Sequence, residues 1–243
     1  MKIFNCLLIV LISLIMASCT KDSTEIELID PSFVGPNIIL TKTMDSNGIN
    51  SSDMRVGLSD INGNFVPVKD GWVKVNGNLM KVKQNIVNNK KSYYYSADDI
   101  YNDIGINTLY DFEIKLSDGK VYNASITTQD KELYELSLPD SQPKNTDMQI
   151  SWKEIDLINP IRLTVIRIYE NDGTIWSQGM LGFKDAENGA VTITKDHFVD
   201  SSTRIKQAMV RISSLKSGKV DSRLSTGSDI TSTFNIERTC VVK

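Results

Sequence analysis

The stretch DFEIKLSDGK, residues 111–120, is the part of the sequence that decides the fold class. Its apolar residues Phe112, Ile114 and Leu116 occupy every second position, with polar residues between them. Side chains of a β-strand point alternately to the two faces of a sheet, so this spacing predicts a strand with one buried and one wet face. The Asp-Gly pair that follows predicts a tight turn at the end of the strand.

Similar turn signals separate alternating apolar runs along the rest of the chain. Asn-Gly or Asp-Gly pairs occupy residues 47–48, 62–63, 76–77, 118–119 and 172–173. No long stretch carries a helical stripe of apolar residues, and the best helical segment is a single turn around residues 96–103. We therefore predict an all-β protein made of short antiparallel strands.

A break in the pattern near residues 135–147 divides the chain into two parts. This segment, ELSLPDSQPKNTD, contains two prolines and few apolar residues. About a hundred residues lie on each side, which is a common size for a β-sandwich. We predict an N-terminal domain over residues 31–134 and a C-terminal domain over residues 135–243.

The second half resembles a fibronectin type III or immunoglobulin-like sandwich. Its strands would be LSLPDS, MQISWKEI, RLTVIRIYE, TIWSQGM, AVTITKDHF, IKQAMVRISSL and STFNIERTCVV. Trp152 alternates with Ile150, which favours a core position over a ligand-stacking one. The sequence departs from the fibronectin pattern where Ala208 and Met209 stand near the place of the usual tyrosine. The resemblance implies two tandem antiparallel β-sandwiches, the first immunoglobulin-like and the second fibronectin III-like.

The first residues predict export from the cytoplasm. Lys2 precedes an apolar block over residues 7–16, which is shorter than the roughly 20 residues of a membrane-spanning helix. A charged start, a short apolar block and small residues are typical of a secretory signal peptide. The motif MASC that follows resembles the lipobox of bacterial lipoproteins, which implies cleavage between Ser18 and Cys19 and attachment of a diacylglycerol to the cysteine. Met16 stands where leucine is usual, and the alternative is an ordinary signal peptide with a chance cysteine.

The lipobox implies a location as well as an anchor. We expect residues 1–18 to be removed and residues 19–30 to form a lipidated cysteine with a polar tether. Two or three acyl chains hold a protein to a bilayer far more firmly than one. The charged residues after Cys19 resemble the export signal of surface lipoproteins in Bacteroides-like bacteria. We expect an outer-membrane lipoprotein, on the cell surface or the periplasmic face.

Charge and cysteine content exclude several classes of protein. The net charge of −3 comes without a basic cluster, so the chain lacks the electrostatic footprint of a nucleic-acid-binding protein. Of three cysteines, Cys6 would leave with the signal peptide and Cys19 would be acylated. The remaining Cys240 has no partner for an intramolecular disulfide and is expected to be a buried apolar residue rather than a reactive thiol.

Motifs of the common enzyme classes are missing from the sequence. HExxH, GxSxG, the P-loop and the GxGxxG fingerprint are absent, and the one histidine, His197, has no nucleophile pattern beside it. We therefore predict neither an enzyme nor a bound metal or cofactor. Asp98, Asp99 and Asp103 could supply an acid–base pair for hydrolysis of a sugar, although a capped turn and a solvated face explain them better. The stretch from Asp60 to Asn64 has the oxygen-rich look of a calcium loop but is better explained as a hairpin turn.

Two tryptophans near turns are the candidate ligand-binding residues. Trp72 lies beside a turn in DGWVKVNG, and Trp176 follows the Asp-Gly turn in DGTIW. An indole ring can stack on a sugar ring while its N–H stays wet, although core filling is the other interpretation for each. Tyr93, Tyr94 and Tyr95 are consecutive, so a strand here would send Tyr94 to the opposite face from its neighbours.

These features lead to three functional hypotheses. The first is a non-enzymatic envelope lipoprotein that binds a glycan or another envelope protein. The second is a structural subunit resembling the fimbrillins of Bacteroides-like bacteria, which lose an N-terminal segment after a basic residue; Lys42 and Arg55 are the candidates here. The third, an envelope hydrolase that uses carboxylates, has the least support.

Overall fold

The structure of the protein is a computed structural model. It describes residues 25–45, 47–48, 50–87, 90–131, 135–153, 161–171, 174–184, 189–197 and 205–243. Within these ranges the chain forms strands and two single-turn 3-10 helices, η1 (Pro31–Phe33) and η2 (Lys195–His197), and no α-helix. The prediction of an all-β protein is confirmed.

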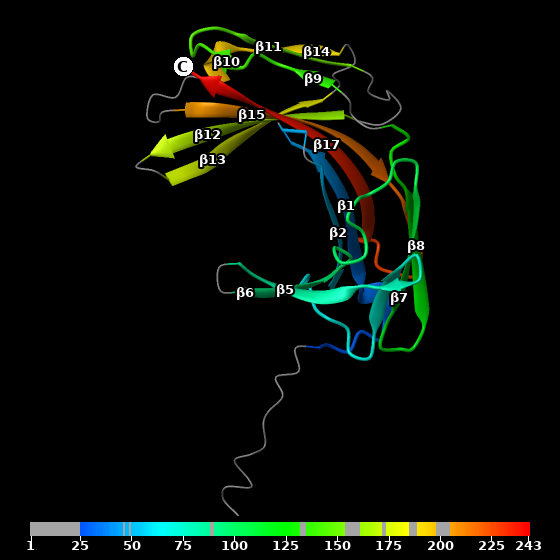
Figure 1. The fold of residues 1–243 in the computed structure, drawn as a ribbon. Helices are drawn as coiled ribbons and strands as arrows, with labels where there is room; N and C mark the ends of the chain where they lie inside the picture. Colours follow the sequence, from blue (N-terminus) through cyan, green and yellow to red (C-terminus); the bar gives the residue numbers. More distant parts are fainter. Residues whose placement is uncertain are drawn as a thin grey trace, which may run out of the picture.

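One large mixed sheet forms the frame of the molecule (Figure 1). Its strands follow in the order β13 (Thr174–Lys184), β12 (Ile161–Asn171), β15 (Ile205–Ser217), β17 (Asp229–Val242), β1 (Gly35–Met44), β2 (Asn50–Ser59), β6 (Lys90–Ser96) and β5 (Lys81–Val87). A ninth strand, β10 (Ser141–Gln142), pairs with the end of β17. The pairings of β17 with β1 and with β10 are parallel, and the others in this sheet are antiparallel.

Two smaller antiparallel sheets cover the two ends of this frame. The five-stranded sheet has the order β16 (Lys219–Val220), β8 (Val121–Thr127), β7 (Leu109–Lys115), β3 (Trp72–Val75), β4 (Asn78–Leu79). The three-stranded sheet has the order β14 (Ala190–Ile193), β11 (Met148–Lys153), β9 (Glu135–Ser137). We call the end under the five-stranded sheet the lower lobe and the end under the three-stranded sheet the upper lobe, as they stand in Figure 1.

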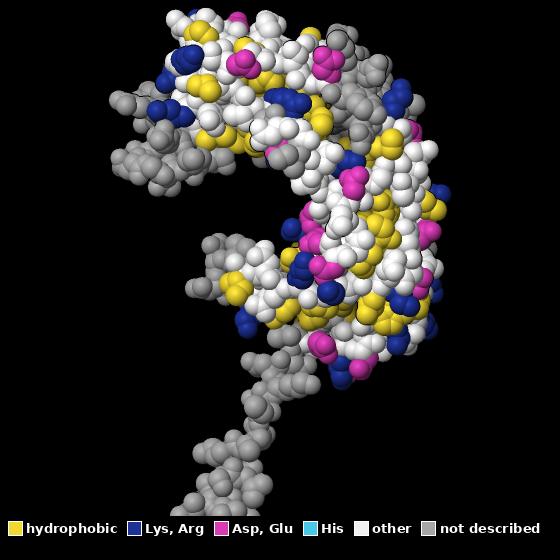
Figure 2. All heavy atoms as spheres, viewed as in Figure 1, with side chains coloured by type: hydrophobic (Ala, Val, Ile, Leu, Met, Phe, Trp, Pro, Cys, Tyr) yellow, Lys and Arg dark blue, Asp and Glu magenta, His cyan; other side chains and the backbone are white. Residues whose placement is uncertain are grey.

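Each lobe has its own apolar core between its two sheets. The lower core includes Tyr110, Phe112 and Tyr122, and the upper core includes Trp152 and Cys240, all buried. The lower core also takes residues from the C-terminal half of the chain, namely Leu224, Ile230 and Phe234. The large sheet bends between the lobes, and its uncovered face borders the hollow that opens between them in Figure 2. The predicted division between residues 134 and 135 is thus spanned by a shared sheet.

The alternation in residues 111–120 produces the expected strand and turn. On β7 the side chains of Tyr110, Phe112 and Ile114 are buried, while those between them are exposed or half-buried. Gly119 in the following turn has φ +79°, and its N–H donates to the carbonyl of Leu116 (3.0 Å). The local pattern therefore fixes which face of the five-stranded sheet is wet.

The segment expected to be a polar tether is attached to the lower lobe over its last residues. Ile26 forms a parallel bridge with Val68, and its N–H donates to the carbonyl of Pro67 (3.0 Å). Leu28 is buried in the lower core, and its N–H donates to Oγ of Ser117 (3.1 Å). The lobe therefore begins before residue 31.

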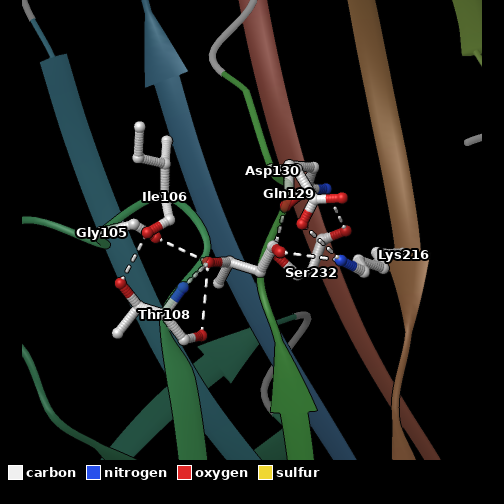
Figure 3. Close-up of polar contacts among 8 residues, drawn as sticks. Gly105, Ile106, Thr108, Gln129, Asp130, Lys216 and Ser232 are labelled. Atoms are coloured by element: carbon white, nitrogen blue, oxygen red, sulfur yellow. Dashed lines mark hydrogen bonds and ion pairs between the residues drawn. The ribbon is translucent and has the colours of Figure 1, made fainter. Parts of the chain in front are cut away.

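The chain passes from the lower lobe to the upper one through a cluster of buried and half-buried polar groups (Figure 3). Gln129 is 1% exposed, and its Nε2 donates to the carbonyls of Ser214 (2.8 Å) and Ser232 (2.9 Å). Its Oε1 accepts from the Ser232 hydroxyl (2.8 Å). Lys216 donates from Nζ to the carbonyl of Thr128 (3.0 Å). We call these five residues the junction; they tie the connection between the lobes to the last residues of β15 and the first residues of β17.

Candidate functional site

A groove of about 410 Å³ crosses the outer face of the five-stranded sheet. Its polar lining consists of Asp111, Glu113, Asn123, Ser125, Lys219 and Asp221. We call it the polar groove. Its floor is the backbone of β7, β8 and β16, so its shape is set by strand pairing rather than by a loop.

Strand register brings the groove residues together. Glu113 of β7 is paired with Asn123 of β8, and Asp111 is paired with Ser125, which is paired in turn with Lys219 of β16. Paired residues of neighbouring strands point to the same face about 5 Å apart. The inward-pointing neighbours on β7 and β8 are core residues, so alternation leaves the groove residues no other orientation.

The turn between β3 and β4 holds one end of the groove. Asn76 has φ +47°, and its N–H donates to the carbonyl of Asp111 (2.8 Å). The N–H of Asp111 donates in return to Oδ1 of Asn76 (2.8 Å). Asparagine tolerates this left-handed conformation better than most residues. The reciprocal pair fixes the backbone that carries the Asp111 carboxylate.

At the other end of the groove, Asp221 is held in its ionised form. Arg223 donates to both of its carboxylate oxygens (Nε–Oδ1 3.0 Å, Nη2–Oδ2 2.6 Å), and these bonds lower the pKa of Asp221 to about 2. The guanidinium lies 4.7 Å from the centre of the Tyr122 ring. Burial and a hydrogen bond to Asp118 raise the pKa of Tyr122 to about 12, so its hydroxyl stays protonated. This end of the groove keeps a fixed pattern of charge near neutral pH.

The groove combines several hydrogen-bond acceptors with a few donors. Carboxylates accept, the amide of Asn123 donates and accepts, and the ammonium of Lys219 donates. A general acid for sugar hydrolysis needs a raised pKa, whereas the pKa of Asp221 is lowered. The chemistry of the groove suits non-covalent binding of a ligand with many hydroxyl groups.

Trp72, one of the two predicted stacking residues, lies on the same sheet face as the groove. It is half-buried on β3, while its neighbour Val73 points into the core. Lys74 lies on the outer face between Trp72 and the groove, since it is paired in register with Glu113. Its Nζ is 4.4 Å from the centre of the indole ring. A ligand that stacks on this face of the indole must therefore displace Lys74.

The other predicted site residues are far from this face or outside the described residues. The backbone of Trp176 lies in β13, an edge strand of the large sheet, whereas Trp72 lies in the five-stranded sheet, so the two tryptophans are not on one surface of one sheet. The side chains of Trp176 and His197 are outside the described part of the chain, as are Ser18 and Cys19. The lipidation prediction therefore remains a prediction.

Asp98 and Asp99 are ion-pair partners of lysines. Oδ2 of Asp98 lies 2.8 Å from Nζ of Lys83, and Oδ2 of Asp99 lies 2.6 Å from Nζ of Lys81. Burial acts to raise the pKa of Asp98, but the hydrogen bonds from Lys83 and Ser96 outweigh it and lower the pKa. The bond from Lys81 lowers the pKa of Asp99. Neither carboxyl resembles a general acid, and the capped-turn interpretation fits them better.

Several structural interpretations of single residues are confirmed. Oδ1 of Asp60 accepts from the N–H groups of Asn62 and Asn64 (2.9 Å each), which is the geometry of a hairpin turn rather than of a calcium loop. Trp152 and Cys240 are buried in the upper core. Burial raises the pKa of the Cys240 thiol, which keeps it unreactive.

The sequence predicts which groove residues face solvent, but not that they lie together. Alternation in DFEIK and VYNASIT marks Asp111, Glu113, Asn123 and Ser125 as wet positions. Nothing local shows that the short strand at Lys219 pairs with β8 and closes the groove. The site was missed because it depends on which strands become neighbours.

The described residues contain neither a candidate metal site nor a helix suited to crossing a membrane. No group of three or more His, Cys, Asp or Glu residues within them could hold a metal ion. No helix in the ranges given above is long and apolar enough to cross a bilayer. No protein-family model matches the sequence, and no curated protein is significantly similar to it.

Proposed function

We propose that the protein is a non-enzymatic, lipid-anchored module of the bacterial outer membrane that binds a glycan in the polar groove. The observation that carries this proposal is the groove itself, an open strip of carboxylate, amide, hydroxyl and ammonium groups on a rigid sheet. Sugar hydroxyls donate and accept hydrogen bonds, and such side chains are their ordinary partners. Because the groove lies on the outer face of the sheet, a ligand could enter it directly from solvent.

Trp72 extends the groove with an apolar surface. The contact between Lys74 and the indole is half-buried, and exposed cation–π contacts contribute only about 0.5–1 kcal/mol. A sugar ring that stacks on the indole would therefore displace Lys74 at small cost. The displaced ammonium would remain beside Glu113, its neighbour in register.

The location and the finer fold are part of the same proposal. The lipobox-like MASC sequence supports lipidation of Cys19 and an outer-membrane position of the Bacteroidetes type. The two separate apolar cores support the interpretation of each lobe as an immunoglobulin-like or fibronectin III-like sandwich. In this interpretation the two sandwiches share the strands β15 and β17.

A glycan array with the purified chain tests the proposal. Glu113→Gln and Asn123→Ala should each weaken binding of the recognised glycan about tenfold, because each removes a hydrogen-bonding group worth about 1–1.5 kcal/mol. Trp72→Ala should weaken it by a similar factor if the ring stacks on sugar. Asp99→Asn, an exposed carboxylate in the turn after β6 and away from the groove strands, is the matched control and should leave binding unchanged. Absence of binding to any glycan or envelope extract would overturn the proposal.

The fimbrillin-like alternative meets a structural obstacle at its candidate cleavage sites. Lys42 is 7% exposed on β1, where it is paired with β2 on one side and β17 on the other. Arg55 is in the middle of β2, where its guanidinium packs over the Tyr94 ring at 5.0 Å. A protease could reach neither peptide bond without separating paired strands. An intact, lipid-linked N-terminus on protein isolated from cells would reject the alternative.

A further inference from the structure

Three exposed apolar side chains lie in the segments that meet at the start of β1, where the chain enters the lower lobe. Ile29 is 59% exposed, Phe33 is 52% exposed and Ile61 is 69% exposed. Pairing of Gly35 with Ser59 places the turn that carries Ile61 beside the start of β1, which Phe33 precedes by two residues. We call these three residues the apolar end of the lower lobe.

The backbone at this end is fixed to the lobe on both sides of Glu27. Ile26 is bonded to the segment before β3, where its carbonyl accepts from the N–H of Lys69 (3.0 Å). The carbonyl of Leu28 accepts from the N–H of Ser117 (3.1 Å), in the turn after β7. Any force applied to the chain at residue 25 is therefore transmitted to the lobe rather than absorbed by a loose segment.

The proposed lipid site is within short reach of the apolar end. Glu25 is six positions after Cys19 in the sequence, and a chain of that length spans at most about 21 Å even when fully extended. The C-terminus lies at the far end of the upper lobe, away from the first described residues (Figure 1). The anchor would therefore hold this end of the molecule close to the bilayer.

The carboxylates at this end accept hydrogen bonds or an ion pair within the protein, and those of Asp30 and Asp60 keep their negative charge. Glu27 is paired with Lys69 (2.5 Å). The carboxylate of Asp30 accepts from Ser32 at the start of η1, and that of Asp60 accepts from its own turn. Unlike a polybasic segment, this surface offers no attraction to anionic lipid, so the suitable partner is a neutral bilayer.

We propose that the apolar end of the lower lobe rests on the surface of a neutral bilayer, with Ile29, Phe33 and Ile61 in the headgroup layer. This inference rests on the proposed lipidation of Cys19, which supplies the main attachment. Apolar side chains at such a surface enter the boundary between headgroups and acyl chains. The contact orients the molecule, so that the upper lobe projects from the membrane and the polar groove stays in water.

Site-directed spin labelling of the lipidated chain in phosphatidylcholine vesicles tests the inference. A nitroxide is attached to Ile61→Cys in one sample and to Ile86→Cys in another. Ile86 is a matched control, 59% exposed on β5 at the edge of the large sheet. Cys240 is buried and will not react under native conditions. The ratio of collisions with oxygen to collisions with an aqueous nickel complex should be several-fold higher at position 61 than at position 86.

A second variant checks that the apolar side chains cause the contact. In Ile61→Cys protein, Ile29→Ser together with Phe33→Ser should lower the ratio at position 61 toward that at position 86. Both residues are exposed, so the fold should be unaffected. Equal ratios at the two positions in protein that floats with the vesicles would overturn the docking inference alone. Protein that fails to float would overturn the lipidation on which the proposed function depends.

Discussion

The lower core is lined by aromatic and aliphatic side chains such as Phe112, whereas the junction in the same molecule buries Gln129, Ser214 and Ser232. Both regions are packed against β17, and both are almost inaccessible to water. In the core the side chains gain free energy by leaving water. At the junction they leave water only because both amide hydrogens of Gln129 and its oxygen find partners.

This difference separates what stabilises the lobes from what positions them. Apolar contacts tolerate small shifts, since burial is non-directional. A satisfied polar cluster has one good geometry, and displacing it leaves buried groups unpaired. We infer that the cores supply most of the free energy of unfolding, while the junction fixes where the connection between the lobes lies on β15 and β17.

Truncating a core aromatic is the change with the largest expected effect. Phe112→Ala should lower the free energy of unfolding by about 3–5 kcal/mol, because the side chain is 1% exposed and a cavity would remain. Denaturant titration followed by circular dichroism measures it. Leu109→Ala on the same strand is the control and should stay within about 0.5 kcal/mol, since that side chain points to solvent. A small loss at Phe112 would mean that the core repacks and is less rigid than the structure implies.

Removing the amide at the junction should cost less than truncating the core. Gln129→Ala leaves the carbonyls of Ser214 and Ser232 without this donor, and an unpaired buried group costs about 1–3 kcal/mol. The same titration gives the loss, and Gln84→Ala on exposed β5 is the control. A loss equal to that of Phe112→Ala would break the distinction between core and junction. No loss at all would mean that water replaces the amide.

The sequence predicted the cores far better than the junction. Alternation at Phe112 and Ile114, or at Ile150 and Trp152, states directly which side chains face inward. A single glutamine after β8 carries no such period, and its partners lie 85 and 103 residues away in the chain.

Long-range pairing explains the other misses. The parallel pairing of β1 with β17 and the two-residue strand at Lys219 have no local signature, because each depends on which segments become neighbours. Leu28 was assigned to a polar tether because one apolar residue makes no periodic pattern, yet it is buried. The same holds for the polar groove. Alternation predicts which of its residues face solvent, but not which strands pair to bring those residues together.

A surface ion pair, Asp221 with Arg223, can be compared with the core and the junction through its effect on stability at low pH. The pKa of Asp221 is about 2 in the folded protein and 3.8 for the free side chain, so folding favours the ionised form. Its stabilisation is present above about pH 4 and is lost as the pH falls toward 2. We expect about 1 kcal/mol, reduced from the full shift because the pair with Arg223 is near solvent. Comparing acid unfolding of Asp221→Asn with that of Asp229→Asn, an exposed carboxylate on β17, isolates the effect. Identical pH profiles for the two variants would show that the Arg223 pair does not stabilise the fold.

Lys42 combines features of the apolar core and of the polar junction, because it is a charged residue on the core face of β1. It is therefore the most sensitive test of the comparison between the two regions. It lies in register with Phe234, its Nζ is 5.8 Å from the centre of that ring, and Oδ1 of Asp103 is 3.1 Å away. Asp103 is 62% exposed, so water can solvate its carboxylate when the ammonium is removed. Lys42→Met keeps the apolar stem and avoids burying a charge, and the free energy of unfolding should change by no more than about 1 kcal/mol.

The contrasting variant is Asp103→Asn, which leaves the ammonium of Lys42 in place while removing the nearby negative charge. If the stem matters more than the charge, Lys42→Met should be at least as stable as Asp103→Asn in the same denaturant titration. A loss of about 3–5 kcal/mol in Lys42→Met would instead show that the buried ammonium is an essential polar member of this region. Lys42 would then belong with Gln129 rather than with the apolar residues that flank it on β1, because its polar group, like the amide, would contribute to the free energy of unfolding through directed contacts.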